Sequence, residues 1–300
     1  MDVSIIIVNY NTSSLLNRCV ESILEKVSNI DFEIIIVDNG SNDCDLFQIE
    51  SDRIRWINCG SNMGFGKANN IGVESAKGEK IFFLNPDTIL INNAVKVLSD
   101  FLDNNPTCGA CGGNLYDANL FPTHSFNRVF PGIIEELDQA FRRQLLKLVY
   151  GKSIMFNHSE IPIRVAFITG ADLMVRKELF CNIGCFNPIF FMYYEDTELQ
   201  YRITKSGAYI FNVPNARIIH LEGKSYKLNL TRETQILISR KKYLSLTHSH
   251  FYNFIANFNY KLYTNLALLY SSIRGDESLK LKFKQRREII NKIRDLNYYE

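Results

Sequence analysis

The sequence predicts an α/β fold in which helices cover a mostly parallel sheet. In the first third of the chain, strand and helix patterns alternate, and several strand patterns are unbroken apolar runs. Such runs are typical of strands buried on both faces, as parallel strands are. The expected strands cover residues 4–10, 32–38, 54–58 and 80–85, and the expected helices cover residues 14–27, 66–76 and 92–104.

The alternation breaks in residues 117–160, which we interpret as an insertion near the acceptor side of a site or as a mobile flap. A helical pattern over residues 133–150 lies inside it. The remaining expected elements are strands at 165–169 and 172–175, a helix that begins near Glu195, and a last strand at 216–220.

Length and composition favour one large domain with an appendage. With 300 residues and 46% hydrophobic content, the chain can bury a full core and is near the upper limit for one domain. We place the catalytic domain at residues 1–228 and a helical extension at residues 229–300. No run of about 18 apolar residues occurs, and the N-terminus enters a strand pattern at once, so we expect a cytoplasmic protein.

The extension is the basic part of the chain. Residues 240–300 hold 12 Lys and Arg against five Asp and Glu, a net charge of +7, which leaves −5 for residues 1–239. The apolar segment 263–273 has basic residues on both sides and is suited to lie along a membrane surface. A helical hairpin packed on the catalytic domain, or self-association, explains the pattern equally well. Nucleic-acid binding is not expected, because the rest of the chain is acidic.

The seven cysteines predict reduced thiols in a core. Cys108 with Cys111, and Cys181 with Cys185, are alternatively zinc ligands or redox pairs. The first pair lies in an expected strand, whereas redox pairs open a helix, and the second pair has an unusual spacing. Buried structural thiols are therefore favoured.

Two carboxylates follow apolar strands at the points where the chain turns. Asp87 comes just after the run at 81–84, and Asp38 follows the run at 32–37. In open α/β sheets, ligands bind outside the carboxyl ends of the strands. We therefore place the active site at this edge, although Asp38 before Gly40 is also typical of a turn-capping acid.

The glycine-rich nucleotide motifs are missing. No Gly-x-Gly-x-x-Gly follows the first strand, and no phosphate-binding Gly-x-x-x-x-Gly-Lys-Ser/Thr occurs in the sequence. The sequence therefore lacks the motifs that usually indicate a dinucleotide-dependent dehydrogenase or a nucleotide hydrolase.

Seven motifs in order resemble the inverting glycosyltransferases of family 2, which have the GT-A fold. The resemblance covers about residues 3–225 and is closest to bacterial rhamnosyltransferases and galactofuranosyltransferases of surface polysaccharide assembly. The motifs are Val8-Asn9-Tyr10-Asn11, Val37-Asp38-Asn39-Gly40-Ser41, Asn62-Met63-Gly64-Phe65-Gly66 with Asn69-Asn70, Leu84-Asn85-Pro86-Asp87, Thr169-Gly170-Ala171, Phe191-Met192-Tyr193-Tyr194-Glu195-Asp196 and His220.

The resemblance implies a divalent cation, Mn²⁺ or Mg²⁺, because a leaving diphosphate accumulates negative charge. Asp87 matches the last acid of the family's Asp-x-Asp motif, and Asn85 replaces the first acid. His220 matches the second metal ligand, although a histidine at a strand end is often structural.

The resemblance also implies a donor site. Asp38 matches the acid that contacts the nucleoside, and Asn9, Tyr10 and Asn11 form the floor beside the base. The remaining donor-binding candidates are Asn62, Gly64, Phe65, Asn69 and Asn85. The segment from Asn62 to Asn69 is alternatively an ordinary glycine loop that caps a helix.

Glu195 and Asp196 match the family's acid pair. An inverting transfer needs a base for the acceptor hydroxyl, and we assign it to Asp196, with Glu195 on acceptor or donor hydroxyls. The two roles are exchangeable, and acids in a first helical turn are also common as caps. Arg202 is expected to pair with either acid, with contact to the diphosphate as the alternative. Thr169, Gly170 and Asp172 are expected to line the acceptor pocket, although Asp172 is equally well explained as a loop acid.

The leading prediction is a metal-dependent inverting transferase. It would move a sugar from a dTDP- or UDP-linked donor to a lipid-linked or oligosaccharide acceptor in O-antigen or capsule synthesis, at the cytoplasmic face of the inner membrane. The resemblance leans toward rhamnose. A nucleotidyltransferase is less well supported, because residues 9–13 offer no basic glycine-rich loop. A degenerate nucleotide-sugar-binding or scaffold module is the remaining alternative.

Overall fold

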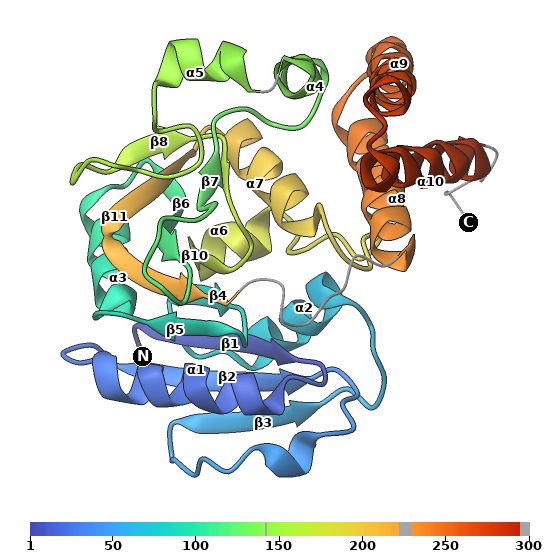
Figure 1. The fold of residues 1–300 in the computed structure, drawn as a ribbon. Coiled ribbons are helices and arrows are strands. Elements are labelled where there is room, and N and C mark those ends of the chain that lie inside the picture. The colour runs from blue at the N-terminus through green and yellow to red at the C-terminus, as the bar shows by residue number, and fades with distance from the viewer. Residues whose placement is uncertain (142, 222–229, 295–300) are drawn as a thin grey trace.

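A large mixed sheet forms the centre of the molecule, with helices on both faces (Figure 1). The computed structural model describes residues 1–141, 143–221 and 230–294. The strand order is β3-β2-β1-β4-β10-β6-β11-β5, and β8 pairs with β11. The strands are β1 (Val3–Asn9), β2 (Phe32–Asp38), β3 (Ile54–Asn58), β4 (Lys80–Leu84), β5 (Thr88–Leu90), β6 (Cys108–Tyr116), β8 (Ile163–Val165), β10 (Asp172–Arg176) and β11 (Tyr209–His220).

Part of the sheet is parallel, as expected. Strands β3, β2, β1 and β4 are parallel neighbours, and β6 is parallel to β11. Strand β10 lies between β4 and β6 and runs antiparallel to both. Because neighbouring parallel strands end at one edge, the residues after β1, β2 and β4 gather there.

Alternate residues of each strand feed two separate cores. From β1, Ile5 and Ile7 pack on the side of helices α1 and α3, while Ile6 and Val8 pack on the side of α2 and α7. All residues of β4 are buried, as its apolar run predicts. The helices on the sheet are α1 (Ser13–Lys26), α2 (Phe65–Ser75), α3 (Ala94–Asn104), α6 (Lys177–Asn182) and α7 (Glu195–Lys205).

The expected elements of the first third of the chain and the start of α7 at Glu195 are confirmed, whereas three details were wrong. The short strand β5 was not expected. Strand β9 (Phe167–Ile168) does not return to the main sheet but pairs with β7 (Phe126–Asn127). The last strand begins at Tyr209, not at residue 216, because Pro214 falls where the β11–β6 register is irregular and interrupts the pattern.

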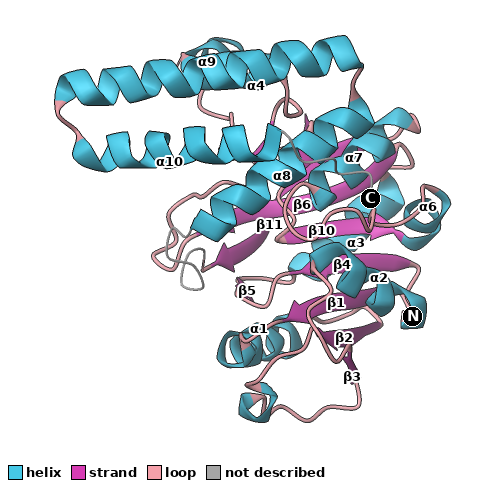
Figure 2. Ribbon diagram, turned by 90° about the vertical axis from the view of Figure 1, so that its right-hand side faces the viewer, coloured by secondary structure: helices cyan, strands magenta, loops and turns pink. Residues whose placement is uncertain are grey.

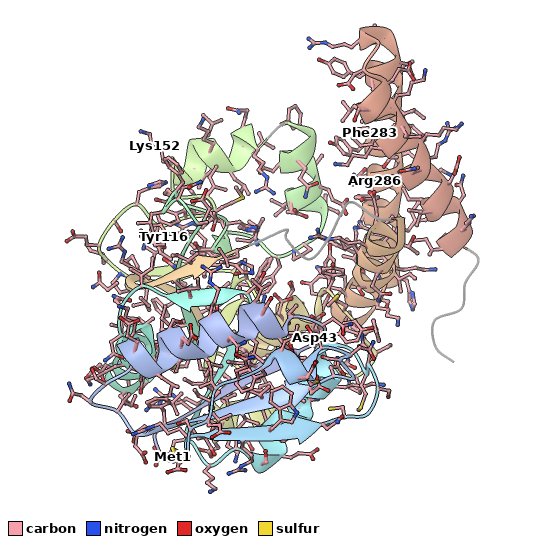
Figure 3. All side chains as sticks on the ribbon, turned by 60° about the horizontal axis from the view of Figure 1, so that its bottom comes forward. Met1, Asp43, Tyr116, Lys152, Phe283 and Arg286 are labelled. Carbon is pink, nitrogen blue, oxygen red and sulfur yellow. The ribbon has the colours of Figure 1, made fainter. Side chains whose placement is uncertain are left out.

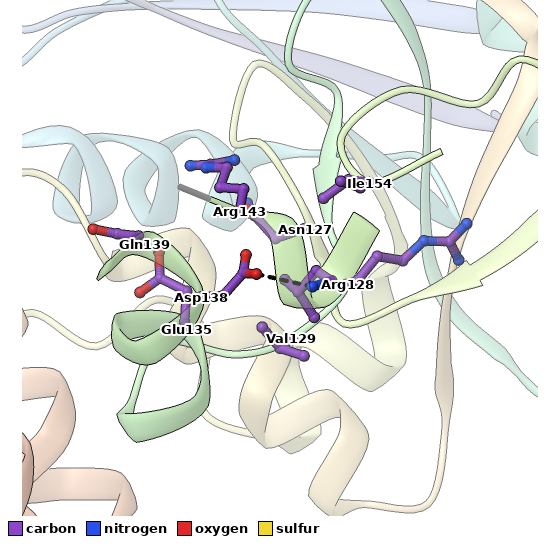
Figure 4. Close-up of a pocket in the computed structure, with 9 residues that line it drawn as sticks. Asn127, Arg128, Val129, Glu135, Asp138, Gln139, Arg143 and Ile154 are labelled. Carbon is purple, nitrogen blue, oxygen red and sulfur yellow. Dashed lines mark hydrogen bonds between the residues drawn. The ribbon is translucent and has the colours of Figure 1, made fainter. Parts of the chain in front are cut away.

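The insertion is a packed unit with two helices, α4 (Ile133–Ala140) and α5 (Gln144–Tyr150), where one was expected. The helix breaks because Arg143 is left-handed, with a φ of 61°. A cavity of only about 10 Å³ lies between α4 and the segment after β7, and Figure 4 shows residues that line it. Beside it, Asp138 accepts a hydrogen bond from Leu146 N at 2.8 Å. Whether the insertion acts as a flap stays a prediction.

The C-terminal extension is helical, as expected, but contains three helices: α8 (Leu230–Thr247), α9 (His250–Arg274) and α10 (Glu277–Arg294). Helices α9 and α10 lie side by side beyond the sheet (Figure 2). The predicted boundary at residues 228 and 229 lies outside the described residues. Among the helices that the structure describes, none is both long and apolar enough to cross a membrane.

All seven cysteines are free. Cys108 and Cys111 are buried in β6, and the Cys111 thiol donates to Leu98 O at 3.7 Å, which is a packing role. Burial raises the pKa of Cys19 to about 12, so its thiol stays protonated. Cys181 is exposed, so the prediction of a buried thiol was wrong at that position.

Candidate active site

The ends of β1 and β2 are joined by a network of polar side chains. Asn9 Nδ2 lies 3.3 Å from Asp38 Oδ1 and 3.1 Å from Ser41 Oγ, and donates to both. The Asp38 carboxylate also accepts from Ser41 N, as a turn-capping acid does. Asp38 is 1% exposed, so its observed contacts are structural, and its nucleoside contact stays a prediction.

Asn11 and Tyr10 form the rim of this edge. Asn11 is left-handed, with a φ of 55°, and its Oδ1 accepts from Asn42 N at 2.8 Å. Tyr10 is exposed, so its ring is available as the predicted floor for a base. Sequence reasoning missed Asp43, which accepts from Ser13 N and Ser13 Oγ at 3.0 Å and caps α1 from a distant loop.

The predicted donor loop connects two segments of the site. Asn62 Oδ1 accepts from Asn39 Nδ2 and Gly64 N, each at 3.0 Å. Gly64 has a φ of +88°, and a Cβ there would lie 2.2 Å from Phe191 O. Phe65 N donates to the same oxygen at 3.0 Å. A side chain at Gly64 would therefore push apart α2 and the segment that leads to Glu195.

Asn69, the last predicted donor residue on α2, turns inward. It is 1% exposed, and its Nδ2 donates to Phe65 O at 3.0 Å in the first turn of the helix. In this structure Asn69 stabilises the helix start, and its donor contact stays a prediction.

Asp87 and His220 meet at the predicted metal position. Asp87 Oδ1 lies 3.3 Å from His220 Nε2, and the side chains are 14% and 11% exposed, respectively. Asn85 Nδ2 lies 3.5 Å from the same nitrogen. Strand β11 pairs with β5 at His220 and Thr88, which brings together residues that are far apart in sequence.

This pair fits a divalent cation that a substrate helps to bind. A carboxylate and an imidazole converge, and both suit Mn²⁺, while Mg²⁺ prefers oxygen. Within residues 1–141, 143–221 and 230–294, no group of three or more His, Cys, Asp and Glu side chains is placed to hold a metal ion. Asp87 and His220 would thus supply two ligands, and diphosphate oxygens and water would supply the rest.

Glu195 and Asp196 open α7 in different surroundings. Glu195 is buried, its Oε2 lacks a hydrogen-bond partner, and burial, with the charge of Asp196, raises its pKa to about 8. Asp196 is half-buried, and burial also raises its pKa, while hydrogen bonds from Thr197 and Gly170 oppose that shift. The two acids therefore differ: Glu195 tends to stay neutral, whereas Asp196 is less buried and accepts hydrogen bonds that favour its carboxylate form.

Glu195 and Asp196 are joined to the pair of Asp87 and His220 through residues 170 and 171. A Cβ at Gly170 would lie 3.0 Å from Asp196 Oδ2, so the backbone passes close to this carboxylate. The next residue, Ala171, accepts from Asn85 N at 3.0 Å. Contacts thus run from Asp196 through this segment to Asn85 and then to His220.

Comparison with known families identifies the class of protein. Residues 4–194 match the model of glycosyl transferase family 2. The chain belongs to this family. The transferase is 26% identical over 310 residues to the N-acetylglucosaminyl-diphospho-decaprenol L-rhamnosyltransferase of Mycobacterium tuberculosis, covering 94% of this chain and 98% of that protein.

Two further similarities cover different parts of the transferase. Glycosyltransferase GlyG of Streptococcus pneumoniae is 36% identical over 101 residues, 32% of this chain, and the chain spans only 33% of GlyG. The crystal structure of GalNAc-T7 with UDP, GalNAc and Mn²⁺ superposes with a TM-score of 0.56 at 18% identity, covering 80% of this chain and 47% of that one. The predicted GT-A fold is confirmed.

The predicted acceptor residues of the transferase differ in how far they are buried. Thr169 and Gly170 are half-buried beside Asp196. Asp172 is 0% exposed, and its Oδ2 accepts from Gly113 N at 2.6 Å inside the sheet. Burial raises the pKa of Asp172 to about 8. Direct acceptor contact by Asp172 has no support in this geometry, because its carboxyl group does not reach the surface.

Arg202 does not pair with the acid pair, and that prediction was wrong. Its guanidinium binds Glu198 through two contacts of 2.8 Å and also donates to the carbonyl of Cys185. An i,i+4 partner on the same helix is closer than Glu195, seven residues earlier.

Sequence reasoning missed three residues that position α7 in the transferase. Gln200 is fully buried, and its amide pairs with the backbone of Ile168 at 2.8 and 2.9 Å. From α8, Ser239 Oγ donates to Met192 O at 2.8 Å, and Lys242 Nζ donates to Ile189 O at 2.8 Å. No local pattern signals these contacts, since partners from α8 are about 50 residues away in the chain.

Proposed function

We propose that this family 2 transferase moves a sugar with inversion from a nucleotide-diphosphate donor to an acceptor hydroxyl, with Asp196 as the base. The observation that carries the proposal is the difference between Glu195 and Asp196. A base must be ionised and accessible when the acceptor arrives. Asp196 is half-buried and accepts from Thr197 N at 2.7 Å, which favours its ionised form.

Glu195 would complement this base as a neutral acid. Its buried Oε2 lacks a partner, and a pKa of about 8 keeps a proton on this group at neutral pH. A neutral carboxyl can donate a hydrogen bond to a sugar oxygen and adds no charge next to Asp196. The exchanged assignment, with Glu195 as the base, would require a buried charge without a partner.

Asp87 and His220 would hold a divalent cation together with the donor diphosphate. When bound, such a cation supplies positive charge that stabilises the leaving diphosphate. Asn85 would orient His220 from 3.5 Å away. The loop of Asn62, Gly64 and Phe65 would pass over the donor. Its contact with Phe191 O, in the segment that leads to Glu195, would keep it close to the acid pair.

We propose dTDP- or UDP-linked sugar as the donor and a lipid-linked or oligosaccharide acceptor, at the cytoplasmic face of the inner membrane. The similarity to a decaprenol-linked L-rhamnosyltransferase over nearly the whole chain supports rhamnose and a lipid-linked acceptor. The exposed ring of Tyr10 offers a surface on which a pyrimidine can stack.

The test is thermal stabilisation of the purified chain by nucleoside diphosphates and their sugars, with Mn²⁺, with Mg²⁺ and with chelator. We expect one base to raise the melting temperature only with metal, since a ligand at a hundred times its Kd stabilises by about 2.7 kcal/mol. An unchanged melting temperature with every nucleotide and metal would contradict the donor site and favour a degenerate module.

A further inference from the structure

Helix α9 carries an exposed apolar stripe. Its outward side chains are large and apolar, and several are more than half exposed, with Phe254 at 70%. Their spacing of three, four or seven residues places them on one face of the helix. The stripe consists of Phe251, Phe254, Phe258, Leu262, Leu266 and Ile273.

The opposite face of α9 packs on the protein. Ala256, Thr264 and Ser271 are buried there, and the Tyr263 ring contacts the Phe283 ring of α10 at 6.0 Å. Phe283 and Arg286 are labelled in Figure 3, and Arg286 forms an ion pair with Glu233 of α8. Helix α9 therefore already buries one face against the protein, and the stripe is its second, outward face.

The insertion packs beside α9. Helices α4 and α5 lie at the same end of the molecule as α9 (Figure 1), and Ile133 N of α4 donates to the Tyr252 hydroxyl of α9 at 2.9 Å. Several of their exposed side chains are apolar, among them Leu137, Leu145 and Leu148, although Gln144 and Lys147 of α5 are exposed as well. A helix of 25 residues is about 37 Å long, and a continuous row of exposed apolar side chains along it marks an interaction surface.

The charge around the stripe indicates what covers it. Residues 250–294 hold nine Lys and Arg against three Asp and Glu. Lys282, Lys284 and Arg287 of α10 are exposed. A second copy of the chain would bring two such positive surfaces together, whereas an anionic lipid surface would attract them.

We propose that the outward face of α9, extended by α4 and α5, docks on an anionic lipid bilayer. The phenylalanine and leucine side chains enter the boundary between headgroups and acyl chains, and the basic residues of α10 contact the headgroups. Since α8 is hydrogen-bonded to Met192 and Ile189, docking would hold the segment before Glu195 at a fixed height over the membrane.

The test is co-sedimentation of the full chain with vesicles of phosphatidylcholine and with vesicles of equal parts phosphatidylcholine and phosphatidylglycerol. We expect stronger binding to the anionic vesicles. The double variant Phe254→Ser/Phe258→Ser should bind at least about tenfold more weakly, because two inserted rings are lost. Leu46→Ser is the matched control and should bind as the wild type does, since Leu46 is 50% exposed and lies between β2 and β3, which are at the opposite end of the molecule from α9 (Figure 1).

Charge is tested separately. Lys282→Gln/Lys284→Gln should weaken binding to the anionic vesicles by about fivefold for each residue and leave binding to phosphatidylcholine unchanged. All these positions are exposed, so melting temperatures should stay at the wild-type value. The readout is vesicle binding alone, so its result is independent of the transfer reaction proposed above.

Two results would overturn the docking surface. One is equal vesicle binding by wild type and Phe254→Ser/Phe258→Ser. The other is a dimer in sedimentation velocity that the same variant dissociates, without vesicle binding by the wild type. The second result would assign the stripe to another copy of the chain.

Discussion

The active-site edge of the sheet and the helical extension use their side chains in opposite ways. At the edge, polar groups such as Asn9 and Asp38 are buried and bonded to one another before any ligand arrives. In α9, apolar groups such as Phe254 face outward. The edge is thus organised in advance for a polar ligand, and the extension presents a surface that gains stability only when something apolar covers it.

The two regions are also connected. Besides Ser239 and Lys242, Arg240 of α8 forms an ion pair with Glu136 of the insertion and donates to Asn257 of α9 at 3.0 Å. The Tyr243 ring lies 5.5 Å from the Tyr194 ring, directly before Glu195. The extension therefore packs against the segment that leads to the acid pair, and it also presents the exposed apolar face of α9.

The largest expected effect separates the two acids. Asp196→Asn should lower transfer by about 100-fold or more, as loss of a general base does, while donor binding and the fold remain. Glu195→Gln, which keeps a neutral side chain, should lose clearly less activity. Transfer rates and donor affinity are measured for both variants. Undiminished transfer by Asp196→Asn would remove the assignment of the base.

The next effect concerns the metal pair. Asp87→Asn should weaken metal-dependent donor binding by at least about tenfold, because a carboxylate ligand becomes a neutral amide. Donor affinity is measured by calorimetry with Mn²⁺ and with chelator. With chelator the variant and the wild type should be alike. Equal affinity of the wild type with and without metal would count against a ligand role for Asp87.

The pH dependence of stability tests the neutral state of Glu195. Burial raises its pKa from 4.5 to about 8, so between these values the native state holds a proton that the unfolded chain has lost. Stability should therefore fall as pH rises through this window and level off above about pH 8. Glu195→Gln should lack this part of the loss, a difference of about 1 to 2 kcal/mol between pH 6 and pH 8.

Denaturant unfolding at pH 5, 6, 7 and 8 gives this difference. The buried Asp172 also has a raised pKa, but it is common to both proteins and cancels in the comparison. Parallel curves for wild type and variant would mean that Glu195 is ionised in the native state, and the exchanged assignment of the two acids would then be favoured.

The smallest effect tests the connection between the regions. Ser239→Ala/Lys242→Met removes two hydrogen bonds to the segment before Glu195 and should lower kcat by about fivefold, with little change in KM for the donor. Ser245→Ala is the control, because its hydroxyl bonds only within α8, to Lys242 O. A kcat equal to that of the control would show that the extension does not position the acids.

Sequence predicted the position of the site residues that follow strands. Asp38 ends β2 and Asp87 comes three residues after β4, so the strand pattern places both at one edge of the sheet. Glu195 follows an apolar run, residues 189–194, that forms no strand. The left-handed backbone at Tyr193 and Tyr194, with a φ of 68° at each, has no such signal. Aromatic residues rarely adopt this conformation, and only the tertiary contacts at both sides of the segment hold it.

The burial of Asp172 and the role of the extension were also beyond sequence reasoning. Asp172 lies in a strand between two antiparallel neighbours, and this position depends on the strand order, which no local pattern encodes. The basic pattern of residues 240–300 predicted a surface, but the contacts of Ser239 and Lys242 depend on how α8 packs.

The central claim is that an ionised Asp196 deprotonates the acceptor on the side of the sugar opposite the diphosphate. The most direct test is the anomeric configuration of the product, measured by NMR from the coupling of the new glycosidic bond, with the donor identified by thermal stabilisation. Our account predicts a configuration opposite to that of the donor. A product that retains the donor's configuration would contradict it, because retention does not use a single attack assisted by this base.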